Sequence, residues 1–569
     1  MAARLKRGSW KARLSETKGR IQALHIKIGA TGALIGGAMA EPSQRRARAR
    51  QPKNPAPIVQ PARLNFSWLR QTTWFVLTAL ALSFYLHFNS DNFADPDSFY
   101  HFRHGALYAT TGPFAAEFPW ARYSVIGRLA ADIWYGFHIL LLPFAWFGDP
   151  LIGMRLAGML VTAAFLVAVY WVCRLLEVKA APLWPFVLLF SSAFLLHRLT
   201  MLRPHVLSLA LSVLIFGLLA ARRIGAVFLA AFAVAWLHLT LFFVPLVVLG
   251  VFAVVKLVSE RIWLWRESAA LACGLALGWL LRPNPLGAAE IVYVQLFQWT
   301  VEKLAGAPLE VGSELRPLAI AFHSNYLPHI LISSLALLFL LWRILIRRVE
   351  LAAEQRTLCY AAAALSLGFF FLALLFARRA FDFSSSFAVL TMALIFSYFL
   401  AERKWLGFAF FALSALLAFY GLSLRDRVLA VAWPADRVFT AARWLEAHSE
   451  PGDIVFNLRW EYFAELFFWN TKNHYIGGMD PIFQYAFDPE LYRAGLAVAG
   501  HGSAAILCPG GACGEADAAQ SYEILKGKFN ARYVFLLKQP DAVVFLRLLA
   551  DKRFGLRHHD EHSAVFELR

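Results

Sequence analysis

DNFADPDSFYHFR (residues 91–103) follows directly after the first long apolar segment, and the rest of the chain is best interpreted from it. It places Asp91, Asp95 and Asp97 beside aromatic and basic side chains. A carboxylate cluster next to a membrane span is costly to bury unless water, a metal or a cationic group meets it. The stretch therefore predicts either a capped helix start or a polar site at a membrane boundary.

The composition is that of a polytopic membrane protein. Of the 569 residues, 59% are hydrophobic and 16% are charged, whereas an average soluble protein has about 45–50% apolar and about 25% charged residues. The net charge of +18 is gathered in short basic clusters between apolar runs. Membrane proteins fix their orientation by such clusters, so the charge indicates no nucleic-acid partner.

Apolar runs of membrane-span length follow one another between residues 67 and 424. Because a membrane helix needs about 20 mostly apolar residues, we predict spans at 67–88, 152–172, 181–198, 206–221, 224–239, 241–257, 268–283, 328–346, 357–377, 385–401 and 405–424. The run 133–147 holds His138 and Pro143, and we interpret it as an interfacial helix on the outer face. The basic clusters then alternate between the ends of about eleven spans and indicate a cytoplasmic N-terminus.

The chain divides into three regions on this reading. Residues 1–66 are basic and predict a disordered cytoplasmic tail. Residues 67–424 predict a transmembrane domain with outer loops at 89–151 and 284–327. Residues 425–569 alternate amphipathic patterns with β-like runs (DIVFNL, HYIGG, RYVFLL and AVFEL) and predict an extracytoplasmic α/β domain. In an oxidising compartment, Cys508 and Cys513 there are close enough for a local disulfide, which stays an open alternative.

Asp95 and Asp97 are the leading catalytic candidates. A carboxylate at a membrane–water boundary can act as a general base towards a hydroxyl or amide acceptor, or can hold a divalent metal. The alternative is structural, because Asp97 is well placed as the N-cap of a helix that begins with DSFYHFR.

Two basic groups are predicted on the same face. Arg203 and His205 in LRPHVLSL could bind a phosphate or a metal, and the alternative is a solvated helix start. Arg378 and Arg379 precede an apolar span, where an arginine fork can hold a phosphate bidentately. The alternative there is pairing with Asp382 or extension towards lipid headgroups.

The long outer loop 284–327 is a second possible contributor. It carries Glu302, Glu310 and Glu314 together with aromatic Tyr293 and Trp299. A loop of this kind can cover an active site. Ordinary solvation explains most of these side chains, so the sequence singles out none of them.

Three motifs resemble the GT-C class of membrane glycosyltransferases, and above all the catalytic subunits of oligosaccharyltransferases. DSFYHFR is similar to the first outer-loop motif of that family, which implies Asp97 as the catalytic aspartate and Asp95 as its helper. Arg379 looks like the arginine that contacts the lipid-linked phosphate. The third motif, RWEYFAELFFWN, is similar in place and type to the Trp-Trp-Asp-Tyr-Gly motif of the soluble domain.

The resemblance implies a multi-pass enzyme of the bacterial inner membrane with a periplasmic C-terminal domain. Its donor would be a polyprenyl-phosphate-linked sugar drawn from the membrane lipids, and its acceptor a glycan, a lipid or a protein. The substrate-binding residues on this interpretation are Arg379, Arg378, Arg203, His101, Arg103, Trp460, Glu461 and Tyr462.

Two departures and two alternatives accompany this interpretation. In the soluble-domain motif, Trp-Glu-Tyr-Phe (residues 460–463) stands where the family has Trp-Asp-Tyr-Gly. A second acidic motif of the family helps to bind a divalent metal such as Mg²⁺ or Mn²⁺. The matching turn here, LRPHVLSL, has no carboxylate. Either His205 substitutes as a metal ligand, or the reaction needs no metal. The alternatives are a transporter or lipid flippase, which would place charges and broken helices near mid-membrane, and a non-catalytic envelope assembly protein.

Overall fold

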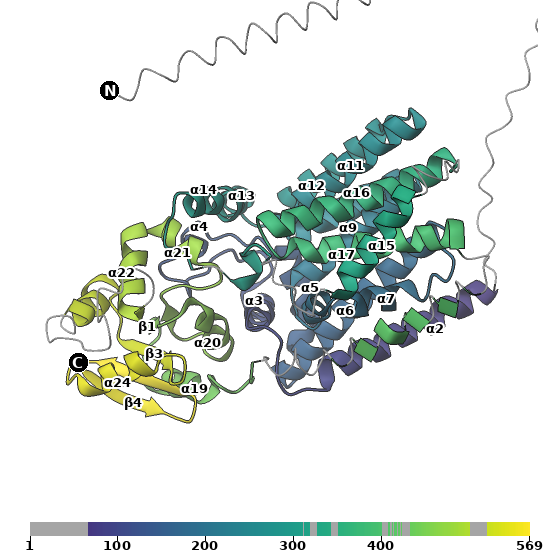
Figure 1. Ribbon diagram of the computed structural model, residues 1–569. Coiled ribbons are helices and arrows are strands. Elements are labelled where there is room, and N and C mark those ends of the chain that lie inside the picture. The colour runs from purple at the N-terminus through teal and green to yellow at the C-terminus, as the bar shows by residue number, and fades with distance from the viewer. Residues whose placement is uncertain are drawn as a thin grey trace, which may run out of the picture. The chain divides into compact units, whose positions relative to one another are not determined.

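The structure is a computed structural model that describes residues 66–310, 312–318, 327–342, 351–400, 433–500 and 520–569, with scattered positions between 405 and 423. The predicted tail 1–66 lies outside these residues except at its last position, and nine of the twenty positions of the predicted span 405–424 lie outside them too. Cys508 and Cys513 are also outside the described residues. Helices make up the described chain before residue 400, and helices with a sheet make up the part after residue 433 (Figure 1).

Long apolar helices dominate the first part, which we call the helix bundle. The longer helices coincide with predicted spans: α2 (Phe66–Phe88), α6 (Pro150–Leu175), α9 (Pro204–Ala220), α10 (Ile224–Leu237), α11 (Phe243–Glu260), α12 (Trp265–Leu280), α15 (Leu327–Trp342), α16 (Ala353–Leu375) and α17 (Ala380–Ile395), which continues as the π-helix η7 (Phe396–Leu400). The shorter elements of the bundle are α3 (Asp97–Thr111), α4 (Val125–Leu129), α5 (Tyr135–Leu141), η1 (Leu142–Trp146), α7 (Trp184–Ser191), α8 (Ala193–Leu199), η2 (Leu239–Leu241), α13 (Pro285–Tyr293), η3 (Val294–Gln298), α14 (Trp299–Leu304) and η4 (Ser313–Leu315).

In the part of the chain that the structure describes, four helices are long and apolar enough to cross a membrane. They are Pro150–Leu175, Leu239–Glu260, Ala353–Leu375 and Ala380–Phe399. A fifth crossing results if the bent pair Ala193–Leu199 and Pro204–Ala220 forms one span. The described helices therefore form a polytopic membrane bundle, while the number of about eleven spans stays a prediction.

The predicted span 181–198 is wrong as a single helix. It consists of α7 and α8, which are separated at Ser192. The backbone of Ser192 is extended, and its hydroxyl accepts a hydrogen bond from the N–H of Leu195 at 3.3 Å, so that this side chain caps α8. Helices α8 and α9 meet at 115°. This bend brings Arg198 and Arg203, at its two sides, to the same place.

The helix predicted over 133–147 is present in two pieces, α5 and η1. Pro143 stands near the start of η1, where the chain changes from α-helical to 3₁₀ geometry. Helix α5 packs against α3, and Gly105 of α3 allows this close approach. A Cβ atom at Gly105 would lie 2.7 Å from the carbonyl oxygen of His138 and 2.9 Å from Cβ of Leu141.

The part after residue 433 is an α/β region with a five-stranded mixed sheet in the order β2-β1-β3-β5-β4. Strands β1 (Ile454–Asn457), β2 (His474–Tyr475) and β3 (Tyr533–Leu537) pair in parallel, whereas β5 (Ser563–Leu568) is antiparallel to β3 and to β4 (Phe554–His559). The four β-like runs of the sequence are β1, β2, β3 and β5. The other elements are α19 (Phe439–His448), η8 (Trp460–Tyr462), α20 (Phe463–Trp469), α21 (Pro481–Phe487), α22 (Pro489–Ala499), η10 (Ile524–Lys528) and α24 (Ala542–Ala550).

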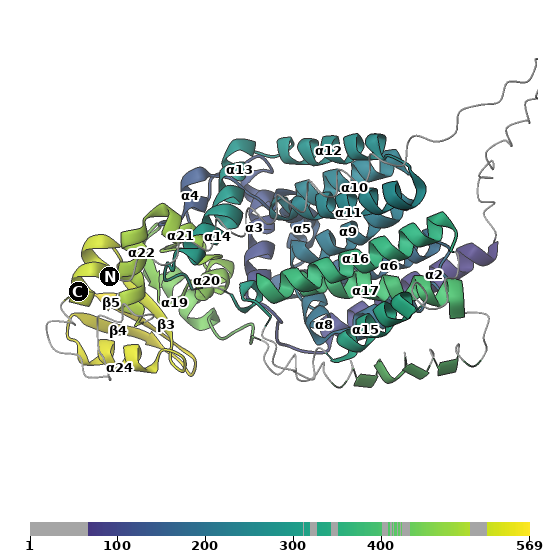
Figure 2. The ribbon, with the colours of Figure 1, turned by 45° about the horizontal axis from the view of Figure 1, so that its top comes forward.

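Helix α3 connects the helix bundle to the α/β region. In Figures 1 and 2 it lies between α5 of the bundle and α20 of the α/β region. The ring of Phe99 on α3 meets the ring of Phe468 on α20 edge to face, with centroids 5.1 Å apart. A backbone bridge joins Phe93, just before α3, to Trp433. The N-terminus of α3 is thereby fixed where the two parts meet.

Candidate active site

A cavity of about 250 Å³ lies at the N-terminus of α3. It is bounded by the bend between α8 and α9, the start of α17, the loop that carries Glu314, and residues of the α/β region. Its charged lining consists of Asp95, Asp97, Arg198, Arg203, Glu314, Arg378, Arg379, Asp382, Glu461 and Asp480. Charged side chains from distant parts of the chain thus converge on one cavity.

Asp97 faces this cavity and does not cap α3. It is the first residue of the helix, Pro96 holds the N-cap position, and no side chain caps the helix end. Burial raises the pKa of Asp97 to about 7; the nearby Arg203 opposes this shift, and the charges of Asp95 and Glu314 add to it. A carboxyl group with this pKa exchanges protons readily near neutral pH, as a general base must.

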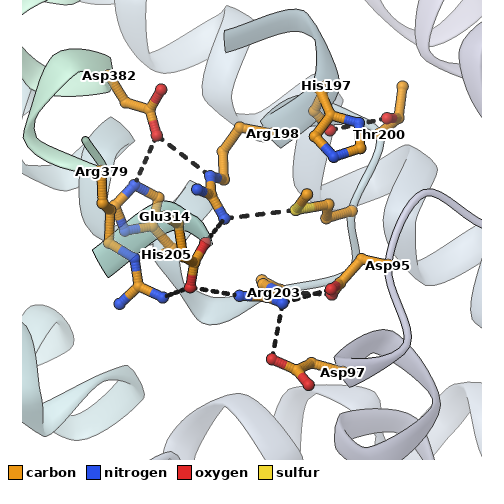
Figure 3. Close-up of polar contacts among 11 residues, drawn as sticks. Asp95, Asp97, His197, Arg198, Thr200, Arg203, His205, Glu314, Arg379 and Asp382 are labelled. Carbon is orange, nitrogen blue, oxygen red and sulfur yellow. Dashed lines mark hydrogen bonds and ion pairs between the residues drawn. The ribbon is translucent and has the colours of Figure 1, made fainter. Parts of the chain in front are cut away.

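Arg203 is the cation that meets the carboxylates of the 91–103 stretch. Its guanidinium forms a bidentate pair with Asp95 through Nε and Nη2. The same Nη2 lies 2.7 Å from Oδ2 of Asp97, and Nη1 donates to Oε1 of Glu314 at 2.9 Å (Figure 3). Arg203 is the N-cap residue of α9, which begins at Pro204. The predicted solvated helix start is therefore wrong, because this end of α9 is buried and ion-paired.

Whereas Arg203 is one guanidinium that pairs with three carboxylates, Glu314 is one carboxylate that pairs with three guanidinium groups. Its Oε1 accepts from Arg203 and from Arg379, and its Oε2 lies 2.7 Å from Nη1 of Arg198. Burial alone would raise the pKa of Glu314, but the three arginines hold that pKa well below its usual range. The predicted pairing of Arg379 with Asp382 does not occur; Arg379 binds Glu314 instead (Figure 3).

Asp382, near the start of α17, also lines the cavity. Its Oδ2 lies 3.1 Å from Nε of Arg198 and 3.2 Å from Nε2 of His205. His205 is 1% exposed and is not among the residues that line the cavity. We call the ion-paired set Asp95, Asp97, Arg198, Arg203, Glu314, Arg379 and Asp382 the cavity cluster.

Three of the other predicted site residues also line the cavity. They are Arg378, whose guanidinium lies over the ring of Phe194 at 4.6 Å, and Trp460 and Glu461 at η8. Tyr462 is not in the lining; it is fully buried, and its hydroxyl donates to Asp541 at 2.7 Å. Tyr462 therefore fixes η8 to Asp541, at the start of α24, rather than contacting a ligand in this cavity.

His101 and Arg103 do not reach the cavity, so their prediction as substrate-binding residues is not supported by the geometry. His101 stands one turn further along α3 than Asp97, about 6 Å deeper, where its Nδ1 lies 2.9 Å from Nε2 of His138. Arg103 projects from another side of α3 and donates to Thr471 at 3.2 Å. The sequence shows the helix but does not show which of its turns meets the cavity.

His101 belongs to a second buried group, which we call the histidine cluster: His101, His104, Asp132 and His138. Oδ2 of Asp132 accepts from Nδ1 of His138 at 2.6 Å and from the hydroxyl of Tyr108 at 2.9 Å. Burial alone would raise the pKa of Asp132, but His138 and His104 hold it well below its usual range. The pKa of His104 is lowered to about 3 by burial.

The cavity cluster does not fit a divalent metal as it stands. The only group of His, Cys, Asp and Glu residues with metal-ligand spacing in the described chain is His104, Asp132 and His138, which lies outside the cavity and whose atoms already bond to one another. In the cavity, Arg203 occupies the position between Asp95 and Asp97, and the Nε2 atom of His205 is directed at Asp382. The weak prediction of His205 as a metal ligand is not supported by this arrangement.

Comparison with known proteins identifies the fold. No protein-family model matches the sequence, and no curated protein matches it. The structure is similar to AglB, an oligosaccharyltransferase from Archaeoglobus fulgidus solved with an inhibitory peptide and a dolichol-phosphate. The TM-score is 0.54 at 14% identity, over 86% of this chain and 73% of AglB. The chain has the GT-C fold.

Two further solved structures of the GT-C superfamily of membrane glycosyltransferases agree. ArnT from Cupriavidus metallidurans, in the apo state, gives a TM-score of 0.52 at 13% identity over 88% of this chain and 98% of ArnT. The arabinofuranosyltransferase AftD from Mycobacteria gives 0.51 at 15% identity over 89% of this chain and 40% of AftD. At these identities the likeness shows the GT-C fold, and the chemistry has to be argued from the cavity.

Proposed function

We propose that this protein is a glycosyltransferase of the bacterial inner membrane that moves a sugar from a polyprenyl-phosphate-linked donor to an acceptor at the outer face. The observation that carries the proposal is a single cavity in which a carboxyl group with a raised pKa, Asp97, lies beside guanidinium groups that suit a phosphate. A general base and an anion site are the two parts that this transfer needs. The GT-C fold supports the same class of reaction.

In the proposed reaction Asp97 removes the proton from the acceptor hydroxyl or amide. The acceptor atom then bonds to the anomeric carbon, while the bond between that carbon and the phosphate oxygen breaks. The electron pair leaves with the phosphate, which remains on the polyprenyl carrier, and the sugar configuration is inverted. Arg379 and Arg203 hold the phosphate, whose negative charge increases as the sugar leaves.

The remaining residues position these groups. Asp95 is bidentate on Arg203 and fixes that guanidinium beside Asp97, which accounts for its role as helper. Trp460 and Glu461 line the cavity from the α/β region, where they would contact the acceptor. Arg378 lies at the same rim as Arg379 and adds positive charge near the phosphate.

The test begins with deletion of the gene, followed by mass spectrometry of lipid-linked sugars and envelope glycans to identify donor and acceptor. Transfer is then measured with the purified protein in proteoliposomes. We expect Asp97→Asn to lower the rate at least about 100-fold, since a general base contributes about 10²–10⁴ in rate. Asp91→Asn is the matched control, because Asp91 lies in the same loop but is not in the cavity lining.

Two results would overturn the proposal. One is transfer by the Asp97→Asn protein at the wild-type rate. The other is movement of a lipid-linked sugar across the bilayer with no transfer to an acceptor, which would support the transporter alternative.

A further inference from the structure

Three arginines share one carboxylate in the cavity cluster, and the carboxylate is supplied by the protein itself. Arg198, Arg203 and Arg379 all direct donors at Glu314 (Figure 3). Arg198 and Arg203 also pair with aspartates, whereas the structure gives Arg379 only Glu314 as a side-chain partner among the described residues. Without Glu314, the guanidinium of Arg379 would have no side-chain anion among the described residues, and Arg198 and Arg203 would each lose one of their acidic partners. Glu314 therefore supplies negative charge to a place where three cations meet.

The site has more hydrogen-bond donors than Glu314 can satisfy. A carboxylate offers two oxygen atoms, and both are already used by the three arginines. Nε of Arg379 is buried and has no hydrogen-bond partner in the described chain. A phosphate group presents more oxygen atoms in a tetrahedral arrangement, and it would supply the acceptor that this donor lacks.

Glu314 can leave the arginines without a change in the backbone. The N–H of Arg379 donates to the carbonyl oxygen of Glu314 at 3.0 Å, and the N–H of Arg378 donates to that of Arg316 at 2.9 Å, so the loop is held by its main chain. The side chain of Glu314 is 19% exposed and lines the cavity. Rotation about its side-chain bonds is enough to free the three guanidinium groups.

We propose that Glu314 is an internal stand-in for the phosphate of the carrier lipid, and that its carboxylate moves off Arg198, Arg203 and Arg379 when that phosphate binds. The inference rests on the proposed function and adds to it the resting state of the donor site. A phosphodiester and a carboxylate carry the same single charge, so the exchange leaves the negative charge that is paired with the three arginines unchanged. When the sugar departs, the phosphate gains a second charge that the three arginines stabilise better than they stabilise one carboxylate.

The experiment measures binding rather than transfer. The full-length protein in nanodiscs of zwitterionic lipid is titrated with a fluorescent long-chain polyprenyl monophosphate. A stand-in competes with the ligand, so we expect Glu314→Gln to bind the probe about tenfold more tightly than wild type. Glu302→Gln is the matched control on the same loop; Glu302 bonds to Tyr485 and is not in the cavity lining. Its affinity should equal that of wild type.

Two further titrations separate the causes. Polyprenol, which lacks the phosphate, should bind wild type and Glu314→Gln equally, because the competition is between anions. Arg379→Ala should weaken phosphate binding in both the wild-type and the Glu314→Gln background. Unfolding temperatures of all variants show whether each one is folded.

Each outcome has a definite meaning. Weaker or unchanged probe binding by a folded Glu314→Gln protein overturns the stand-in role and makes Glu314 an anchor of the loop. If Arg379→Ala binds the probe as well as wild type does, the donor site of the proposed function fails as well. Tighter binding of both polyprenyl phosphate and polyprenol by Glu314→Gln indicates a wider cavity and also overturns the stand-in role.

Discussion

Helix α3 contributes to two polar groups, the cavity cluster and the histidine cluster, which differ in how completely their polar atoms are paired. In the cavity cluster at its N-terminus, charges come from distant segments, face a cavity and are not matched one to one; Nε of Arg379 has no hydrogen-bond partner in the described chain. In the histidine cluster one turn further along, the ring nitrogens of His138 meet Asp132 and His101, and each buried side-chain N or O atom of the four residues has a partner among the described residues. On the proposed function the first group receives a ligand, whereas the hydrogen bonds of the second group hold α3 and α5 together.

The difference shows why burial and a shifted pKa do not identify a site by themselves. Asp97 and Asp132 are both buried acids with shifted pKa values. The pKa of Asp97 is raised, because its burial is not fully offset by Arg203, whereas that of Asp132 is lowered by its histidine partners. An acid whose pKa in the folded protein is close to neutral pH can exchange a proton under working conditions. An acid whose pKa is held far below neutral pH stays ionised and cannot.

The variant with the largest expected effect is Arg203→Gln, which tests whether the cavity cluster differs in function from the histidine cluster. It removes the cation shared by Asp95, Asp97 and Glu314, and breaking a buried ion pair from one side costs about 3–5 kcal/mol. We expect transfer to be lost and the unfolding temperature in detergent to fall clearly. The measurements are proteoliposome transfer and thermal unfolding followed by intrinsic fluorescence.

A double variant separates stability from chemistry in that experiment. Asp95→Asn combined with Arg203→Gln leaves no uncompensated charge at Asp95, so part of the lost stability should return while transfer stays absent. If transfer returned together with stability, Arg203 would be only a structural cation, and the cavity cluster would resemble the histidine cluster.

The second prediction concerns the histidine cluster, and the effect on transfer should be smaller. Asp132→Asn replaces one carboxylate oxygen by an amide nitrogen, either Oδ2, which accepts from His138 and Tyr108, or Oδ1, which accepts from the N–H of Trp134. Either replacement leaves a buried donor unsatisfied at a cost of about 1–3 kcal/mol. We expect a lower unfolding temperature and a transfer rate within about tenfold of wild type. A loss of transfer as large as that of Asp97→Asn, with an unchanged unfolding temperature, would show that this cluster takes part in the chemistry.

The third prediction is the pH dependence of transfer. The unprotonated form of Asp97 is the active base, and its pKa is raised to about 7. The rate should therefore be constant above that pH and should fall about tenfold per unit below it. It is measured with proteoliposomes buffered equally on both sides. A rate that rises as the pH falls would contradict the role of Asp97 as a base.

Much of the fold follows from the sequence, because long apolar runs form helices wherever they occur. The break at Ser192 has no Gly or Pro beside it, because the prolines of this apolar run, Pro182 and Pro185, lie at its start; only the hydroxyl that caps α8 marks the break. The strands of the α/β region were found from their alternating or fully apolar runs. Strand β4 was not among the predicted runs, and it carries basic residues on its exposed side.

The site was predicted only where a motif marked it. Asp97, Arg203 and Arg379 stood out because charges next to apolar spans need partners. The sequence does not predict Glu314, Arg198 or Asp382 as site residues: Glu314 is one of several acids in an outer loop, and Asp382 is predicted only as a partner of the neighbouring arginines. Their role depends on contacts between segments 65 to 184 residues apart, which no local pattern encodes.

The smallest expected effect is that of metal removal, and it tests the cavity cluster most directly. Asp95 and Asp97 share the guanidinium of Arg203, so a divalent ion would have to displace a bidentate ion pair before it could bind there. We therefore expect a chelator to change the transfer rate by less than about twofold, and wild type to bind no Mn²⁺ at the cavity by electron paramagnetic resonance. Arg203→Gln is the informative control. It frees the carboxylates of Asp95 and Asp97, whose oxygen atoms are suitable ligands for Mn²⁺, so this variant should gain Mn²⁺ binding. Activity that is lost on chelation and restored by Mn²⁺ would mean that Arg203 leaves its carboxylates in the working enzyme, and the cavity cluster would then have a second arrangement.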